Sequence, residues 1–194
     1  MVLLKIAFAA GLSVAVGGQA DPVTWQIDPV HSEMTFRVRH FVTKVPGTFK
    51  VWEGSIVADP ANLGQGGSVA VTVQTGSVDT KNERRDTHLR SPDFFAADSF
   101  PTMTFKSTKV DVRGTAITLT GDLTIRGTTK SVVLTGEYSG TAGPPVAKQQ
   151  RIGFSATTKI NRLDYGLKWN RLVEGSNMLG DDVEITIAIE AVRQ

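Results

Sequence analysis

The sequence predicts an all-β domain of about eight antiparallel strands. Most segments alternate apolar and polar residues with a period of two, which is typical of strands with one buried and one wetted face. Only the stretch from Lys81 to Phe105 has the character of a helix. With so little helix to cover a sheet, the apolar faces must pack together in a closed barrel or a two-sheet sandwich, and periodicity leaves both open.

The first half of the chain predicts four strands, which are separated by turn residues. Residues 44–47 (Lys-Val-Pro-Gly) predict a turn, and the glycine-rich run at 64–67 predicts a loop. An interruption is expected at Gly54 within the third strand. The predicted strands cover residues 24–27, 34–40, 48–59 and 68–78.

The second half predicts further strands with the same alternation. Gly121 predicts a bend or bulge, and residues 126–129 predict a hairpin turn. A long polar loop is expected over residues 166–180, with Trp169 as a candidate flap or an exposed contact. The predicted strands cover residues 102–112, 117–125, 130–139, 151–160 and 183–189.

A short helical excursion is predicted near residues 81–97, between two strands. Asp79 and Thr80 offer capping oxygens for a first helix, and Ser91-Pro92 resembles the start of a second. The clustered charges of residues 84–88 have two interpretations: a polar site for an anionic head group, or an ion-pair network that satisfies backbone groups.

Residues 1–20 predict a cleaved secretory signal peptide, because a short apolar run precedes a small-residue cleavage site at Gly18-Gln19-Ala20. The segment is too short to span a bilayer, and residues 21–194 form the expected single domain. Export predicts a periplasmic location. The absence of cysteine excludes disulfides and thiolate sites, and no basic block points to nucleic acid.

Several motifs resemble the signature of the YceI-like family. They are His31-Ser32 with Phe36 and His40, Gly47-Thr48-Phe49, Asn82-Glu83-x-Arg85-Asp86-x-His88-Leu89, Phe94-Phe95, Phe100-Pro101, Phe105-Lys106-Ser107-Thr108, Gly121-Asp122-Leu123-Thr124-Ile125-Arg126-Gly127 with Thr129-Lys130, and Asn161-Arg162-x-Asp164-Tyr165-Gly166. Their order and their span, from Asp28 to the last strand, make the resemblance specific.

The resemblance implies a lipocalin-like barrel that binds a long apolar amphiphile, such as a polyisoprenoid, a quinone tail or a prenyl diphosphate. On that basis the expected function is non-catalytic binding, transport or sequestration, with no cofactor and no metal. The expected apolar lining is Phe36, Val38, Phe49, Phe94, Phe95, Phe105, Leu119, Leu123, Ile125, Phe154, Ile160, Ile185 and Ile187. The expected polar end is His40, Arg85 and His88, and Trp52 would shorten the tunnel if it points inward.

Three alternatives remain open at this point. A Ser–His–Asp hydrolase could use His31 or His88, although no Gly-x-Ser-x-Gly elbow is present. A metal site could use His31, His40 and His88, although their spacing matches no compact metal motif. A surface-binding module would depend on exposed aromatics such as Trp169. The sequence also leaves open the identity of the lipid and whether the chain forms a homodimer.

Overall fold

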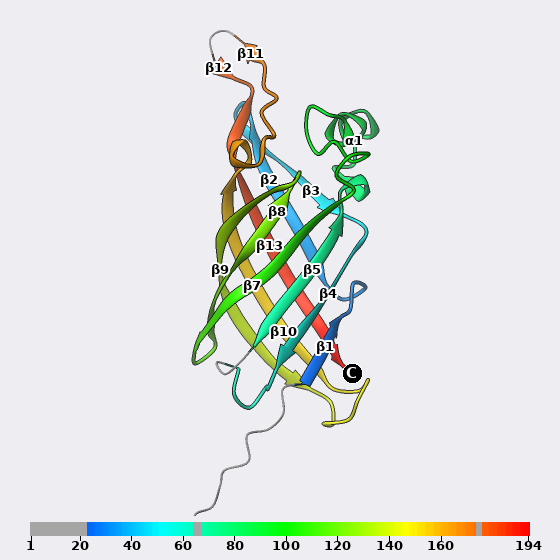
Figure 1. The fold of residues 1–194 in the computed structure, drawn as a ribbon, viewed down its shortest axis with the longest axis vertical. Helices are drawn as coiled ribbons and strands as arrows, with labels where there is room; N and C mark the ends of the chain where they lie inside the picture. The colour runs from blue at the N-terminus through cyan, green and yellow to red at the C-terminus, as the bar shows by residue number, and fades with distance from the viewer. Residues whose placement is uncertain (1–22, 64–66, 174–175) are drawn as a thin grey trace, which may run out of the picture.

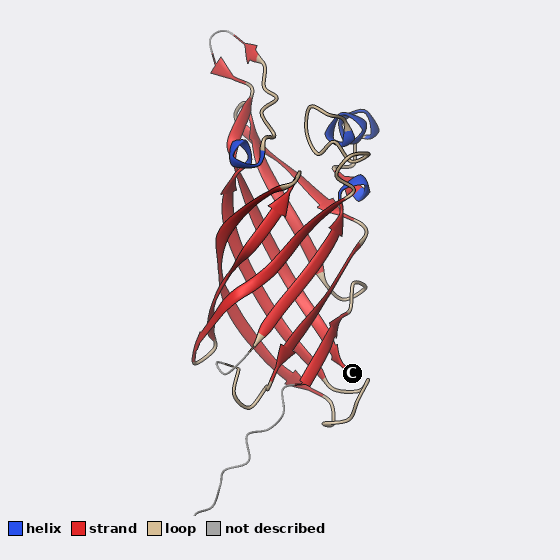
Figure 2. Ribbon diagram, viewed as in Figure 1, coloured by secondary structure: helices blue, strands red, loops and turns tan. Residues whose placement is uncertain are grey.

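The computed structural model describes residues 23–63, 67–173 and 176–194, and over these residues the chain forms an antiparallel β-barrel (Figures 1 and 2). The predicted signal peptide, residues 1–20, lies outside the described residues. Eight strands close the ring, each paired antiparallel with the next and the last with the first. In ring order they are β1 (Val23–Ile27), β4 (Trp52–Ala58), β5 (Ser68–Gln74), β7 (Thr102–Arg113), β8 (Ala116–Ile125), β9 (Thr128–Ala142), β10 (Arg151–Asn161) and β13 (Leu179–Arg193).

Further elements extend the ring at one end. They are β2 (Glu33–His40), β3 (Thr43–Phe49), β6 (Val78–Asp79), β11 (Leu172–Val173), β12 (Ser176–Asn177), the helix α1 (Glu83–Arg90) and the 3-10 turns η1 (Thr75–Ser77) and η2 (Arg162–Tyr165). In Figure 1, α1 and the β11–β12 hairpin stand at the opposite end from β1 and the C-terminus. We call these the α1 end and the β1 end.

Closure depends on the last strand. β13 pairs with β10 along most of its length, with β2 near its start and with β1 near its end. A strand at an open edge would expose unpaired N–H and C=O groups, so pairing on both sides leaves β13 without an open edge. The expectation of a closed antiparallel barrel of about eight strands is confirmed.

Two tight hairpins differ in how well the sequence predicted them. Arg126 and Gly127 both have positive φ, as a two-residue type I′ turn requires, and they lie where a turn was expected. The turn expected at residues 44–47 is wrong, because these residues belong to β3 and the chain reverses at Phe41-Val42. Pro46 is tolerated because β6 pairs only with Thr48 and Phe49, so the other edge of β3 at Pro46 has no partner strand.

The irregularity predicted at Gly121 appears on the neighbouring strand. The register of β7 against β8 shifts between Ser107 and Lys109, opposite Gly121. A side chain at Gly121 would collide with the Phe105 ring and would lie 2.6 Å from the Lys106 carbonyl oxygen. Glycine is therefore needed where the bulge presses the two strands together.

The helical excursion is shorter than predicted. α1 begins after Asn82, whose side-chain oxygen accepts a hydrogen bond from Arg85 N at 3.0 Å, so Asn82 is the cap and not Asp79 or Thr80. The second helix expected at Ser91-Pro92 is wrong, since residues 91–99 form turns. Their backbone N–H groups bond carbonyls of α1 and of neighbouring turn residues, as in Phe95 N to Leu89 O at 3.0 Å.

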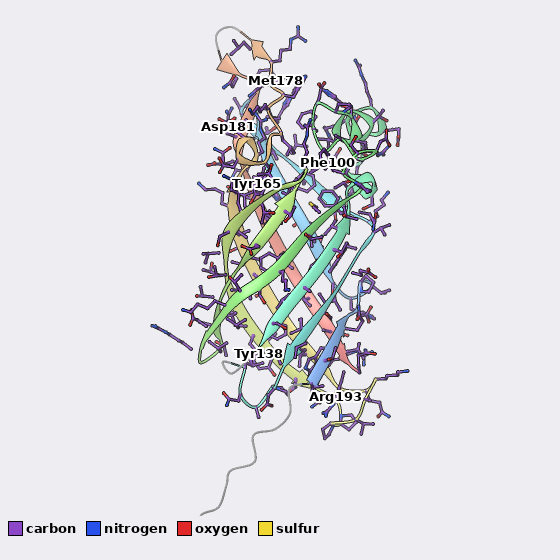
Figure 3. All side chains as sticks on the ribbon, in the orientation of Figure 1. Phe100, Tyr138, Tyr165, Met178, Asp181 and Arg193 are labelled. Carbon is purple, nitrogen blue, oxygen red and sulfur yellow. The ribbon has the colours of Figure 1, made fainter. Side chains whose placement is uncertain are left out.

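Several side chains are buried at the β1 end of the barrel. Trp25, Ile152 and Ala191 are essentially unexposed, and Trp25 Nε1 donates to Ala58 O at 3.1 Å. Figure 3 places Tyr138 and Arg193 at this end, whereas Phe100, Tyr165 and Met178 lie at the α1 end. In the described part of the chain, the helices are too short and too polar to cross a membrane.

Candidate functional site: an apolar cavity with a cationic mouth

The interior of the barrel holds a cavity of about 990 Å³. This volume lies at the upper end of the range typical of small-molecule sites, roughly 300–1,000 Å³. Nearly all of its surface is apolar, and its lining comes from every strand of the ring together with α1. The space inside the sheet is therefore a ligand-sized void.

The pleat of the strands explains the lining. Alternate residues of each strand point inward, and most are Val, Ile, Leu or Phe. Inward residues of a filled barrel would be fully buried, but residues such as Phe36, Leu119 and Ile185 are only half-buried because they face the void. The cavity wall includes every residue that the sequence suggested as apolar lining: Phe36, Val38, Phe49, Phe94, Phe95, Phe105, Leu119, Leu123, Ile125, Phe154, Ile160, Ile185 and Ile187.

Trp52 does point inward. Its side chain is buried and contributes to the cavity wall. Trp25, Ile152 and Ala191 are buried at the β1 end and are not among the cavity lining. The cavity does extend into this half of the barrel, because Ala58, Leu63 and Ser68 belong to its lining.

The charged lining gathers at the α1 end. Five cavity residues carry a guanidinium or imidazole group, while no Asp, Glu or Lys of the described chain contributes to the lining. Two of these five residues, Arg84 and Arg85, are exposed, as is the lining residue Asn82, so the cavity meets solvent there. The five basic residues are His40, Arg84, Arg85, His88 and Arg162.

The two neighbouring arginines differ in their freedom. Arg85 donates from Nε to Thr80 Oγ1 at 2.6 Å and from Nη2 to Thr80 O at 2.7 Å. The buried Asp86 carboxylate accepts from Thr80 N at 2.9 Å and from Thr80 Oγ1 at 2.5 Å. Within the described residues, the Arg84 guanidinium has no hydrogen-bond or ion-pair partner. Arg85 thus anchors the helix, and Arg84 is the one that is available to a ligand.

Aromatic side chains form the rim of this mouth. The His88 ring packs edge-on against Phe94 and Trp169, with ring centroids 5.1 Å and 4.8 Å away. The ring centroids of Phe94 and Trp169 are 5.4 Å apart. His88 Nε2 is hydrogen-bonded to Asp93 Oδ2 at 2.9 Å. Arg126 Nη1 donates to Phe94 O at 2.8 Å and ties the rim to the barrel. Trp169 is half-buried in this cluster and is not an isolated exposed aromatic.

Arg162 holds the segment that carries Trp169, a role that sequence reasoning missed. The side chain is 4 % exposed and donates to the carbonyls of Leu167, Trp169 and Gly180 as well as to Asp181 Oδ1. Burial lowers the pKa of the guanidinium, and the Asp181 carboxylate opposes that shift. Beside it, burial raises the pKa of Tyr165 to about 12, so the phenol is neutral at ordinary pH. The sequence signal for this role is the motif Asn161-Arg162-x-Asp164, which by itself indicates only the family.

His31 lies at the other end of the barrel from His40. Its Nδ1 is 2.8 Å from Asp28 Oδ2 and 4.0 Å from Glu190 Oε1, near the C-terminal end of β13, whereas His40 pairs with Leu179 at the start of that strand. The hydrogen bond to Asp28 raises the pKa of His31, and the same bond lowers the pKa of Asp28.

The three histidines therefore do not form one metal site. The only His, Asp or Glu group of ligand-like spacing in the described part of the chain is Asp28, His31 and Glu190, and Arg151 Nε already lies 2.7 Å from Glu190 Oε1.

Neither His31 nor His88 has a serine hydroxyl on its ring over the described ranges. Ser32 Oγ bonds the Glu190 backbone, and Ser91 Oγ bonds the His88 carbonyl. The Ser–His–Asp arrangement suggested as an alternative is not formed by these residues.

A closed eight-stranded antiparallel barrel with an apolar cavity and a helix at its mouth defines a lipocalin-like barrel. The chain belongs to the YceI-like family: the YceI-like domain matches residues 25–191. The resemblance seen in the sequence motifs is confirmed.

Relatives from distant bacteria match over most of their length. A UPF0312 protein of Vibrio cholerae is 35 % identical over 168 residues, covering 86 % of this chain and 88 % of its own. One from Staphylococcus epidermidis is 36 % identical over 168 residues, covering 86 % and 95 %. One from Pseudomonas paraeruginosa is 33 % identical over 191 residues, covering 97 % and 96 %.

Solved structures share the fold. A YceI protein of Campylobacter jejuni has a TM-score of 0.69 at 29 % identity, covering 98 % of this chain and 99 % of its own. BcnA of Burkholderia cenocepacia has a TM-score of 0.74 at 22 % identity, with 84 % and 98 % covered. A domain from Saccharophagus degradans, described as polyisoprenoid-binding, has a TM-score of 0.66 at 15 % identity, with 89 % and 99 % covered. The last two show the fold alone.

Proposed function

We propose that the protein binds a long apolar amphiphile, of the polyisoprenoid or quinone-tail type, inside its barrel, and that it carries or sequesters this lipid without chemical change. The observation that carries the proposal is the cavity of about 990 Å³ with an almost wholly apolar wall. The polyisoprenoid-binding description of the Saccharophagus degradans domain, which shares the fold, agrees with it.

The cavity size suits a long chain. At about 30 Å³ for each methylene-sized group, it holds on the order of 30 such groups. Burial of an apolar chain gives about 0.8 kcal/mol per methylene, so ten of them contribute about 8 kcal/mol. That is the free energy of a micromolar Kd. Hydrophobic burial alone therefore suffices for tight binding, and neither a covalent bond nor a metal is required.

The direction of the lipid follows from the charge distribution. The tail points toward the packed β1 end, and the head group lies at the α1 end beside His40, Arg84, Arg85 and His88. Because acidic side chains are missing from the described lining, this end favours an anionic head such as a phosphate or diphosphate over a cationic one.

Carriage in the periplasm fits the predicted signal peptide, and secretion through residues 1–20 is part of the proposal. The absence of a serine hydroxyl on the ring of His31 or His88, over the described ranges, supports a role without catalysis.

Extraction of the natively purified protein with organic solvent, followed by mass spectrometry, tests the proposal directly. We expect a stoichiometric isoprenoid or similar lipid. Uptake of an added prenyl phosphate is followed by tryptophan fluorescence, because Trp52 and Trp169 both line the cavity. Absence of both a co-purifying lipid and any uptake would contradict the proposal.

A matched pair of variants adds a control. Leu119→Gln places a polar amide on the cavity wall and should weaken uptake, whereas Thr118→Gln changes the preceding residue of the same strand, which is not part of the wall. Equal loss of uptake in both variants would show that the effect is not due to the cavity.

A further inference from the structure

The α1 end exposes apolar side chains on two neighbouring tips. Val42 is 96 % exposed and Phe41 41 % exposed at the β2–β3 turn, and Leu172 is 69 % exposed at the start of the β11–β12 hairpin. A group of exposed apolar side chains on projecting tips is a candidate contact for a partner.

The two tips form one surface. Phe41 N donates to Met178 O at 2.8 Å, and Met178 N donates to Arg171 O at 3.0 Å, which fixes the β2–β3 turn against the base of the hairpin. Asn170 bonds both the N–H and the C=O of Leu179 and holds the hairpin in line with β13. Figure 1 shows the hairpin projecting beyond the barrel at this end.

This surface adjoins the cavity mouth. The His40 ring packs edge-on against the Phe41 ring, and their centroids are 4.8 Å apart. His40, Trp169 and Met178 all contribute to the cavity wall. The same short segments therefore present apolar groups outward and line the opening inward.

The surface is also basic. Segments 39–44 and 168–178 contain four basic residues and one acidic residue, Glu174. Lys44 is paired with Glu184 at 2.5 Å, but within the described ranges Arg39, Lys168 and Arg171 have no carboxylate partner. The basic residues are Arg39, Lys44, Lys168 and Arg171.

We infer that these tips dock the mouth of the barrel onto an anionic phospholipid bilayer. Phe41, Val42 and Leu172 insert into the headgroup region, while the neighbouring cations attract the negatively charged surface. The inference rests on the proposed function: a long apolar tail that passes from bilayer to barrel avoids exposure to water only if the mouth faces the membrane. An anionic bilayer fits the two features together, because a purely apolar partner would not need the cations.

Vesicle flotation tests the inference. Wild-type protein should bind vesicles of phosphatidylcholine with about 30 % phosphatidylglycerol and not vesicles of phosphatidylcholine alone, because binding depends on the anionic charge. Raising NaCl from about 0.15 M to about 1 M should release it as the Debye length falls from about 8 Å to about 3 Å.

Variants identify the surface. Val42→Asp should weaken binding about tenfold, through loss of apolar contact and added negative charge. Arg171→Gln should weaken it about fivefold, as expected for one surface cation. The matched control is Val133→Asp on the outer face of β9, a valine that is 50 % exposed, which should bind as wild type. Equal thermal stability of the variants checks that each is folded.

The outcomes separate the docking inference from the proposed function. Uptake of a prenyl phosphate from detergent solution needs no bilayer and should be unchanged in Val42→Asp. Absence of wild-type vesicle binding, or equal binding by Val42→Asp and wild type, overturns the docking inference and leaves the carrier proposal standing. If Val42→Asp instead dissociates a dimer seen by size-exclusion chromatography while vesicles bind neither form, the surface is an interface between copies of this chain, and the inference is overturned.

Discussion

Replacing Arg162 by methionine tests whether this one buried side chain positions the rim of the cavity. The guanidinium donates to three main-chain carbonyls, at Leu167, Trp169 and Gly180, and to the Asp181 carboxylate. Methionine fills similar space without any donor, so those groups lose their partners.

The expected cost is large for a single substitution. Loss of one partner from a buried ionic network costs about 3–5 kcal/mol. In a chain of this size each kcal/mol lowers Tm by about 2–4 °C, so we expect a decrease of roughly 10 °C. Because the Trp169 carbonyl is one of the released groups, the indole should leave its contacts with His88 and Phe94, with a red shift of its emission.

Thermal unfolding and Trp fluorescence measure both effects. Arg171→Met, in the same segment but exposed, is the matched control and should change Tm by less than about 1 °C, as most surface substitutions do. A Tm for Arg162→Met within about 2 °C of the wild type, together with unchanged emission, would refute the assignment of Arg162 as the anchor. In a chain of this size, a shift of about 2 °C corresponds to a loss of less than about 1 kcal/mol in the free energy of unfolding.

The remaining predictions concern pH, packing and the head group. Because the pKa of His31 is raised, its bond to Asp28 stabilises the fold below pH about 6.5, and this stabilisation is lost as pH rises through the folded-state pKa. Because the pKa of Asp28 is lowered, the same bond is also lost in acid. The free energy of unfolding, measured from pH 5 to 9, should therefore fall slightly in the wild type and not in His31→Gln. Parallel curves for the two proteins would contradict this prediction. The value of about 6.5 is the reference pKa of histidine. Gly47→Ala should push the Phe36 ring into the cavity and reduce lipid uptake with little loss of stability. Gly136→Ala collides with the main chain of Ser155 and should prevent soluble expression. A soluble Gly136→Ala variant together with an insoluble Gly47→Ala variant would disprove the packing argument. Arg84→Gln should weaken binding of a prenyl phosphate about tenfold and leave that of the uncharged prenol unchanged, since hydrogen bonds to charged groups contribute about 1.5–3 kcal/mol; equal weakening of both would argue against a head-group role.

Much of the fold could be predicted from local patterns. The alternation in residues 34–40, 117–125 and 183–189 predicted β2, β8 and β13, because a strand with one buried face must repeat every two residues. Arg126-Gly127 predicted its hairpin, since a type I′ turn depends on the residues of the turn itself. The wrong turn at residues 44–47 and the absent helix at Ser91 share a cause. Pairing with β2 and hydrogen bonds to α1 overrode the local preference of Pro46 and Pro92.

By itself the sequence determined most of the strands, the place of the helical excursion, the family and the set of inward apolar residues, because these follow from periodicity and from motifs that are local in the chain. Only the tertiary structure decided that the ring closes, that Trp25, Ile152 and Ala191 are buried at the β1 end, and that the interior keeps a void with its basic residues gathered at the α1 end. The tertiary structure also decided the different roles of Arg84 and Arg85, which are adjacent in sequence. The Arg85 guanidinium bonds Thr80, whereas the Arg84 guanidinium is available to a ligand. Such outcomes depend on which side chains meet across strands far apart in the sequence, and no local pattern encodes that meeting.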